Sequence, residues 1–349
     1  MCVVCVLFLL ALTTAVAVSA QTVPAARKSL HLSVPLRKAM PGPAITDADW
    51  TAMVGHTGVI TTDGAISSLA FGNDGSLYLG GSFTIVNNCG AKGVAKWNGG
   101  AWTAFGTVGY NITALAVDGS GDMYAGGQFD TVGGITAKNL AVCKGGAWSA
   151  LGSGTNGTIA NLACNKKSQL YVYGEFDTIG GIPARNIAVW RGNAWSALGA
   201  GAQGINALVC DNNAGLYVAG AFDSIGGVVA KSIAQWNGAA WSALSSGNSG
   251  QGLSDGVGNT CSSHRRGGVY SFANDGNGNL YVGGDFVKAG GLTVNSIAKW
   301  NGSTWDSLGS GIDWNFECMN FQMSGVFALA TDRSGNLYAG GEFHQGRRR

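Results

Sequence analysis

The stretch LYVAGAFDSIGGVVAKSIAQWNGAAWSAL (216–244) contains the pattern that recurs along this chain. Its first seven residues have five counterparts, which are LYLGGSF (77–83), MYAGGQF (123–129), LYVYGEF (170–176), LYVGGDF (280–286) and LYAGGEF (337–343). From each of these tyrosines to the next, the steps are 46, 47, 46, 64 and 57 residues. A recurring period of this length indicates one structural unit copied in tandem. The period is about 46 residues, and two insertions lengthen it near the C-terminal end.

Each repeat predicts four short antiparallel strands, which we name a, b, c and d. In the second repeat they are ITALAVD (112–118), MYAGGQF (123–129), NLAVC (139–143) and AWSAL (147–151). The c–d turn is Lys144-Gly145-Gly146 here and Asn-Gly in other repeats, a strong hairpin signal because these residues tolerate positive φ. Four such strands in roughly 40–50 residues are typical of a propeller blade. We therefore predict an all-β fold, a single β-propeller of four-stranded antiparallel blades, about six in number.

The composition suits many short strands joined by glycine turns. Glycine accounts for 58 of 349 residues, hydrophobic residues for 46% and charged residues for 11%. Ordinary proteins contain about 7% glycine and about 25% charged residues. Only 5 prolines occur, which argues against a collagen-like or disordered chain. The net charge of +2 is too small to indicate a nucleic acid or an anionic membrane as partner.

The N-terminus predicts a secretory signal peptide over residues 1–20. An apolar run spans residues 3–18, and Val18-Ser19-Ala20 suits signal peptidase. An uncleaved membrane anchor is the alternative, because the run approaches the ~18 residues of a membrane span. Residues 21–42 would then be a leader and residues 43–349 the propeller. We expect a secreted or cell-surface protein with no membrane span after signal cleavage.

The two ends of the chain predict one shared blade. Residues 43–46 and WTAM, beginning at Trp50, have the pattern of strands c and d, whereas the C-terminal repeat stops after strand b. A last blade that combines them would remove exposed strand edges. The alternative is that the chain is a fragment of a longer repeat array.

The recurring glycines and tryptophans predict packing rather than binding. Tryptophans lie five residues apart across most c–d turns, for example Trp236 and Trp241. A residue repeated at one blade position indicates packing against the adjacent blade. Binding of a sugar is the alternative interpretation of these tryptophans. The Gly-Gly pair of strand b predicts backbone crowding or a bend, because no phosphate-binding motif follows it.

The order YxGG, apolar strand, tight turn and Trp-x-x-Leu resembles the kelch and galactose-oxidase-like propeller repeat. The fuller string YVGGxF…GG…IAxWNGxxWxxLGSG is similar to repeats of secreted bacterial proteins and to the ectodomain of the fungal cortical marker for cell polarity. The resemblance covers residues 48–343. It implies the propeller fold and says little about activity. The copper ligands and Cys–Tyr crosslink of galactose oxidase find no matching set of residues here.

Residues for catalysis or metal binding are few. The chain has only 4 histidines, and no spacing indicates a catalytic triad, a zinc site or a cofactor site. Asp275-Gly-Asn277-Gly-Asn279 resembles the start of a calcium loop, but Leu280 and Phe286 replace the required glycine and glutamate. We interpret this aspartate as a turn cap.

The two insertions are the best candidates for specificity, since long loops on a rigid scaffold often carry function. They span residues 246–268 and 311–325, each between strand d of one blade and strand a of the next, a connection expected to share a face with the b–c loops. Their aromatic and cationic residues either contact a ligand or cap the core locally. The candidates are His264, Arg265, Arg266, Trp314, Phe316 and Phe321.

The repeat also predicts a ring of cations, Lys92, Lys138, Arg185 and Lys231, at the start of strand c. They could attract an anionic ligand, or form salt bridges with Asp130, Asp177 and Asp223, which precede three of them by eight residues. A second ring follows the Gly-Gly pair of strand b and includes Glu175 and Asp285.

Six cysteines remain after signal cleavage, an even number that permits disulfides in an exported chain. Cys261 and Cys318 lie in the two insertions, and we predict that they pair. Cys164 and Cys210, at equivalent positions of neighbouring strands a, are a weaker candidate pair. The sequence therefore predicts a secreted binding or scaffold module for a protein or polysaccharide. A carbohydrate-active or oxidase-type enzyme is the first alternative, and a structural surface component or polarity-marker fragment is the second.

Overall fold

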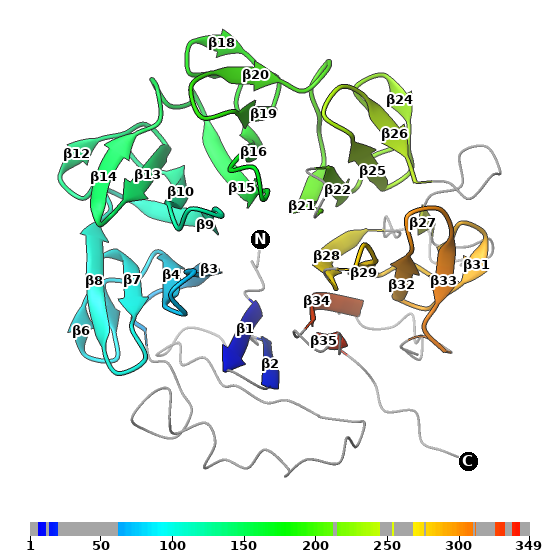
Figure 1. Ribbon diagram of the computed structural model, residues 1–349, viewed down its shortest axis with the longest axis horizontal. Coiled ribbons are helices and arrows are strands. Elements are labelled where there is room, and N and C mark those ends of the chain that lie inside the picture. The colour runs from blue at the N-terminus through cyan, green and yellow to red at the C-terminus, as the bar shows by residue number, and fades with distance from the viewer. Residues whose placement is uncertain are drawn as a thin grey trace, which may run out of the picture. The chain divides into compact units, whose positions relative to one another are not determined.

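The computed structural model describes residues 62–211, 215–244, 253–254, 268–275, 277–309, 311, 325–331 and 337–342, with two strands near the N-terminus. Every regular element in these ranges is a β-strand (Figure 1). The chain divides into two compact units. The first contains Met1–Leu7, Val18–Leu162 and Gly174–Ile182, and the second contains Phe8–Ala17, Ala163–Tyr173 and Pro183–Arg349.

The first unit contains two four-stranded antiparallel sheets, blades 1 and 2, in the strand order a-b-c-d. Blade 1 consists of β3 (Ile66–Phe71), β4 (Leu77–Gly81), β7 (Gly93–Trp97) and β8 (Trp102–Thr107). Blade 2 consists of β9 (Asn111–Val117), β10 (Met123–Gln128), β13 (Leu140–Lys144) and β14 (Ala147–Ala150). These bounds confirm the four predicted strands of the second repeat to within one residue.

The second unit contains blades 4 and 5 and a sixth sheet. Blade 4 consists of β21 (Ile205–Cys210), β22 (Leu216–Gly220), β25 (Ile233–Trp236) and β26 (Trp241–Ala243). Blade 5 consists of β28 (Val269–Asn274), β29 (Leu280–Gly284), β32 (Ile297–Trp300) and β33 (Trp305–Ser307). In the described residues the sixth sheet has two strands, β34 (Gly325–Thr331) and β35 (Leu337–Glu342).

Blade 3 contributes residues to both units. It consists of β15 (Thr158–Cys164), β16 (Leu170–Glu175), β19 (Ile187–Trp190) and β20 (Trp195–Ala197) in one four-stranded sheet. Five complete sheets and a sixth pair of strands therefore match the predicted number of repeats.

Between strands b and c each blade carries a small hairpin that the strand pattern did not predict. In blade 2, Gly133 and Gly134 form its turn with φ of 57° and 84°, and in blade 1 Asn87 and Asn88 replace them with φ of 44° and 65°. Turns of this kind need positive φ at both central residues. The hairpins are β5 (Ile85–Val86) with β6 (Cys89–Gly90), β11 (Thr131–Val132) with β12 (Ile135–Thr136), β17 (Thr178–Ile179) with β18 (Ile182–Pro183), β23 (Ser224–Ile225) with β24 (Val228–Val229), and β30 (Lys288–Ala289) with β31 (Leu292–Thr293).

The chain that leads into strand a pairs with the hairpin of the same blade. Val108 bridges Val132 in blade 2, and Thr155 bridges Ile179 in blade 3. In blade 5 the short strand β27 (Leu253–Ser254) takes this place and pairs with β30. The d–a connections and the b–c hairpins therefore lie on one side of each blade, as the sequence predicted. We call this side the hairpin face.

In blade 2 the Gly-Gly pair of strand b is closely packed on both sides. A Cβ at Gly126 would lie 2.6 Å from Cγ2 of Ile159, in strand a of the following blade. A Cβ at Gly127 would lie 2.2 Å from the Asn111 carbonyl oxygen, where the register of β9 and β10 shifts. The predicted backbone crowding is confirmed.

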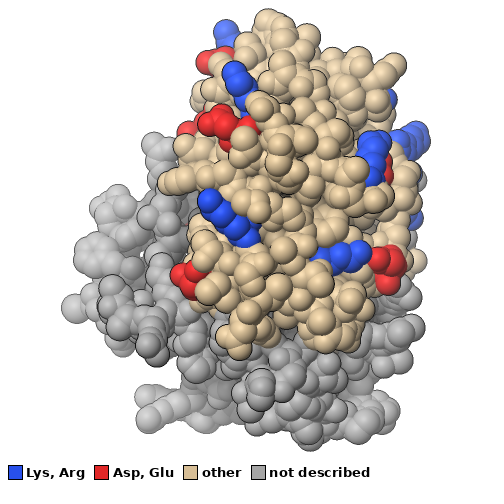
Figure 2. All heavy atoms as spheres, turned by 90° about the vertical axis from the view of Figure 1, so that its left-hand side faces the viewer, with Lys and Arg blue, Asp and Glu red and all other residues tan. Residues whose placement is uncertain are grey.

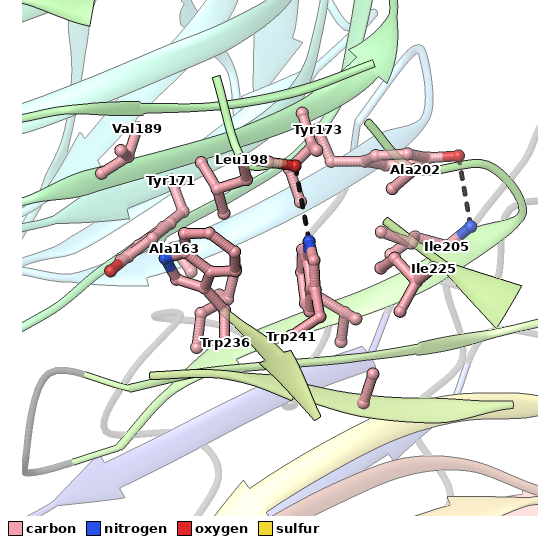
Figure 3. Packing of buried hydrophobic residues seen from close by; sticks show 14 of the residues in the cluster. Ala163, Tyr171, Tyr173, Val189, Leu198, Ala202, Ile205, Ile225, Trp236 and Trp241 are labelled. Carbon is pink, nitrogen blue, oxygen red and sulfur yellow. Dashed lines mark hydrogen bonds between the residues drawn. The ribbon is translucent and has the colours of Figure 1, made fainter. Parts of the chain in front are cut away.

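The tryptophans of the c–d hairpins pack between blades, as predicted. Trp236 and Trp241 have ring centroids 5.2 Å apart, and both belong to a core that includes Tyr171 of blade 3 (Figure 3). Trp241 Nε1 donates to the Leu198 carbonyl oxygen at 3.4 Å, the bond drawn in Figure 3. Trp148 and Trp305 donate in the same way to the Phe105 and Leu244 carbonyl oxygens at 3.0 and 3.1 Å. The partner is thus the preceding blade.

Near the N-terminus, β1 (Val6–Ala11) and β2 (Thr14–Ser19) form a two-stranded sheet within the segment predicted as a signal peptide. The leader 21–42 and the expected c–d strands of residues 43–54 lie outside the described residues. No helix long and apolar enough to span a membrane occurs in the described part of the chain.

Candidate functional site

The exposed large hydrophobic side chains of the described residues all belong to the hairpin face. In the first unit they are Ile85 of β5, 44% exposed, and Tyr110 in the connection between β8 and β9, 69% exposed. In the second unit they are Val229 of β24, 65% exposed, and Leu292 of β31, 46% exposed. A single exposed hydrophobic residue is normal on any surface. In each unit, their restriction to the hairpin face of the blades marks that face as a candidate contact surface.

The backbone around Tyr110 is held firmly. The Gly109 N–H donates to the Thr131 carbonyl oxygen at 2.9 Å, and the Val108 N–H donates to the Lys92 carbonyl oxygen at 3.1 Å. The aromatic ring is therefore presented from a connection that is anchored to both blades. Because this connection is already ordered, binding a partner through Tyr110 would cost little loop entropy.

Polar caps fix the hairpins themselves. In blade 1 the Asp63 carboxylate accepts the N–H groups of Thr84 and Ile85 at 2.7 and 2.9 Å, and also the Thr84 hydroxyl. The hydroxyl hydrogen bond is the main reason why the pKa of Asp63 is lowered. In blade 3, Asn156 Oδ1 accepts the N–H groups of Asp177 and Thr178 at 2.9 and 3.0 Å. The face is thus rigid in both blades.

The four predicted cations also lie on the hairpin face, Lys92 and Lys138 in the first unit, Arg185 and Lys231 in the second. All four side chains are exposed. The carbonyl oxygens of Lys92, Lys138 and Arg185 accept N–H groups of the following d–a connection, at 3.1 to 3.2 Å.

The salt-bridge interpretation of these cations is wrong. In the described residues the ion pairs are Lys96–Asp74 at 3.3 Å and Lys144–Asp122 at 2.7 Å, so none joins the cations to Asp130, Asp177 or Asp223. The b–c loops are closed by the backbone instead, because the Asp130 and Asp223 carbonyl oxygens accept the N–H groups of Ala137 and Ala230 at 2.8 and 3.0 Å. The cationic side chains extend into solvent.

The outer side of the first unit offers little charge. Figure 2 shows the side where β6, β8, β12 and β14 lie in Figure 1, and it is mostly uncharged with scattered Lys, Arg, Asp and Glu. The exposed residues of these d strands include Thr103, Ala104, Ser149 and Ala150. The hairpin face therefore differs from these outer strands by its exposed aromatic and apolar side chains, which lie beside its cations.

The insertion residues His264, Arg265, Arg266, Trp314, Phe316 and Phe321 lie outside the described residues, as do Cys261 and Cys318. Their roles in binding and in a disulfide stay predictions. Within the first insertion, the described strand β27 lies on the hairpin face through its pairing with β30.

The weaker disulfide prediction is wrong. Cys164 and Cys210 are thiols, as are Cys89 and Cys143. Cys210 packs as a small apolar side chain against the core that contains Val218 and Trp236, and burial raises the pKa of its thiol. Buried thiols of this kind behave as small hydrophobic groups.

The calcium-like segment is a capped turn, as predicted. Asp275 Oδ1 accepts the N–H groups of Asn277 and Asn279 at 2.8 and 3.1 Å. Burial alone would raise the pKa of Asp275, but the Asn279 side chain and these N–H groups lower it overall. Within the described ranges no three His, Cys, Asp or Glu residues are placed to hold a metal ion.

No protein-family model and no curated protein matches the chain. Among solved structures it is similar to PorZ, a bacterial surface component of the type-IX secretion system of Porphyromonas gingivalis, with a TM-score of 0.50 and 16% identity over 80% of this chain and 39% of PorZ. It is also similar to an ancestral GH74 enzyme, with a TM-score of 0.48 and 14% identity over 78% of this chain and 34% of the enzyme. For YCF48, solved with a D1 peptide, the TM-score is 0.41 and the identity 13%, over 71% and 68% of the two chains.

The repeated sheets and the likeness to PorZ decide the fold. The chain is a β-propeller. It spans about two fifths of PorZ and a third of the GH74 enzyme. At 16% identity the likeness to PorZ shows the fold alone. The resemblance to the kelch, secreted bacterial and fungal polarity-marker repeats is supported to the level of the propeller fold.

Sequence reasoning found the cations of this face but missed Tyr110, Val229 and Leu292. Tyr110 and Val229 occur once, so a search for repeated positions passes over them. The signal of Val229 is its departure from the repeat, since at its position the other blades have glycine, threonine or proline. Leu292 stands where other hairpins have Ile135, Ile182 or Val228, so the sequence does not distinguish it.

Proposed function

We propose that this propeller is an exported binding module that holds a protein or glycan partner on its hairpin face. The observation that carries the proposal is the restriction of the exposed large hydrophobic residues to that face. Tyrosine is among the residue types that most often dominate binding energy at an interface, and Tyr110 is the most exposed of the four.

The cations of the same face add positive charge around the exposed apolar side chains. Lys92 lies beside the Tyr110 connection, to which its carbonyl oxygen is bonded, and its side chain is exposed. A polar and charged rim around a small apolar centre is the usual anatomy of a specific interface. The apolar segment of residues 3–18 supports export, and with it an extracellular or cell-surface partner.

The test is to probe glycan arrays and arrays of extracellular proteins with the labelled chain, and then to measure Kd for each ligand found. Tyr110→Ser should weaken binding about tenfold or more, as expected for a central interface residue. Ser149→Ala, on the outer strand β14, is the matched control and should bind as the parent protein does. Both variants should keep the parental Tm, because both side chains are outside the core.

Two results would overturn the proposal. Binding that survives Tyr110→Ser, Val229→Ser and Leu292→Ser combined would place the partner elsewhere on the molecule. Turnover of a bound glycan would identify an enzyme, the alternative that the sequence left open.

A further inference from the structure

The second unit carries an aromatic pair that the repeat does not require. The second residue of the strand-a motif is Tyr270 in blade 5 and Phe327 in the sixth sheet. The same position is occupied by Ser67 and Thr113 in the first unit and by Asn206 in blade 4. Strand a begins at the d–a connection, which lies on the hairpin face. The second residue of strand a is therefore close to that face.

The two rings and one carboxylate form a compact group. The ring centroids of Tyr270 and Phe327 are 5.4 Å apart with an interplanar angle of 40°, which places β28 beside β34 (Figure 1). The Tyr270 hydroxyl donates to Asp285 Oδ2 at 3.0 Å, and the Gly268 N–H donates to Asp285 Oδ1 at 2.7 Å. These two donors hold the carboxylate at the hydroxyl end of the Tyr270 side chain. All three side chains are half-buried.

The pair is not needed for the adjacent core. The core between blade 5 and the sixth sheet is built from Ala273, Ile297, Val326 and Leu329, and neither ring belongs to it. The other strands a use small or polar residues at this position and still form their blades. Two large aromatic residues at the rim of a scaffold that does not need them indicate a ligand contact.

We propose that Tyr270, Phe327 and Asp285 form a subsite for one neutral pyranose ring of a glycan. This deepens the proposed function and rests on it. The apolar face of a pyranose would lie against the aromatic rings, and its hydroxyl groups would donate to the carboxylate. A few fixed polar groups among aromatic side chains are the usual composition of a small-molecule site.

A polyol matches the polar groups of this region. Asp285 is an acceptor, and the exposed amide of Asn206 is tied to the start of β28 by a hydrogen bond from Nδ2 to the Val269 carbonyl oxygen at 3.2 Å. A cationic ligand would also be attracted by rings and a carboxylate. It would, however, approach a face on which the same unit carries Arg185, Lys231 and Lys288. A neutral ligand avoids this repulsion.

The experiment uses the full chain and defined probes. Saturation-transfer NMR and calorimetry would be run with hexasaccharides of β-1,4-glucan, β-1,3-glucan and β-1,4-mannan. Tetramethylammonium would serve as the cationic probe. The variants are Phe327→Leu, which keeps an apolar side chain but removes the ring, and Asp285→Asn. Tyr281→Phe is the matched control, because it alters a tyrosine at the opposite end of strand b in the same blade.

At least one hexasaccharide should bind, with saturation transferred from aromatic protons to the ring hydrogens of the sugar. Phe327→Leu and Asp285→Asn should each weaken that binding about tenfold, while Tyr281→Phe leaves it unchanged. The subsite is overturned if no hexasaccharide binds, if binding survives both variants, or if tetramethylammonium binds in their place. Loss of partner binding in Tyr110→Ser with none of these sugar effects would remove the subsite and keep the proposed function.

Discussion

At the scale of single residues, the strand-d tryptophan joins three parts of the propeller. Trp241 is 6% exposed and donates to the carbonyl oxygen of Leu198 in the preceding blade. On its other side it packs against the hairpin turn, where a Cβ at Gly226 would lie 2.3 Å from Trp241 Cδ1. One side chain thus links its own strand, its own hairpin and the adjacent blade. Its recurrence in the repeats has a packing cause.

Trp241→Ala should therefore lower the free energy of unfolding by about 3–5 kcal/mol, because it removes a large buried ring and leaves a cavity. Trp241→Phe should lower it less, since the ring volume is partly kept and chiefly the hydrogen bond is lost, at about 1 kcal/mol. Urea unfolding followed by circular dichroism measures both, with Ser149→Ala as the neutral control. A change below about 1 kcal/mol in Trp241→Ala would contradict the packing role.

The turn aspartates make stability depend on pH in a known direction. The pKa of Asp275 is lowered in the folded chain, where the carboxylate accepts N–H groups of its own turn. A lowered pKa means that the ionised form stabilises the fold above the unfolded pKa of about 4. This stabilisation is lost as the pH falls through the folded pKa. Tm should thus decrease more steeply between pH 5 and pH 3 in the parent than in Asp275→Asn, and equal slopes would contradict this.

At the scale of elements, the b–c hairpin is the part of the blade that sequence patterns did not reveal. Strands of two residues are too short to show the alternation that identified strands a to d. The usable signal was the Gly-Gly pair between β-branched residues, as in Ile225-Gly226-Gly227-Val228. Both glycines have positive φ, 55° and 87°. In blade 1 Asn87 and Asn88 serve instead, so the dipeptide alone would have missed that copy.

The two glycines of this turn should differ in their tolerance to substitution. Either alanine variant places a side chain at positive φ, which costs roughly 1–2 kcal/mol. Only the Cβ of Gly226→Ala would also collide with Trp241, because nothing lies within 4 Å of the Gly227 position. Gly226→Ala should therefore lower Tm clearly more than Gly227→Ala, measured by differential scanning calorimetry. Equal losses would show that the tryptophan moves aside at no cost.

The candidate site was predictable only in its repeated part. Lys92 and Lys138 recur at one position, so the repeat itself placed them on the hairpin face. Tyr110 has no counterpart in other repeats, and Phe327 has only Tyr270. The exposure of Tyr110 and the pairing of the two rings follow from connections and strand neighbours that the sequence does not specify. Fold-determining residues recur, whereas binding residues differ from blade to blade.

At the scale of the whole molecule, stability depends on contacts between successive blades. In the first unit Asn73 Nδ2 donates to the Gly119 carbonyl oxygen at 3.0 Å, which joins blades 1 and 2. In the second unit Asn274 Nδ2 donates to the Cys210 carbonyl oxygen at 3.2 Å, and the Thr331 hydroxyl donates to the Asn274 carbonyl oxygen at 2.6 Å. In such a repeat architecture each unit is stabilised by its neighbours. Loss of a contact between two blades should accordingly destabilise both of them.

The sixth sheet makes the closure prediction testable. In the described residues β35 pairs only with β34, whereas strand b of every complete blade also pairs with a strand c. An exposed strand edge would invite aggregation, so we expect residues 43–54 to supply strands c and d. Deleting residues 21–42 should then leave Tm unchanged, whereas deleting residues 21–54 should lower it and promote aggregation. Trp50→Ala should be as destabilising as Trp241→Ala, since both would fill the same blade position. Identical Tm values for the two deletions would show that these residues do not complete the blade.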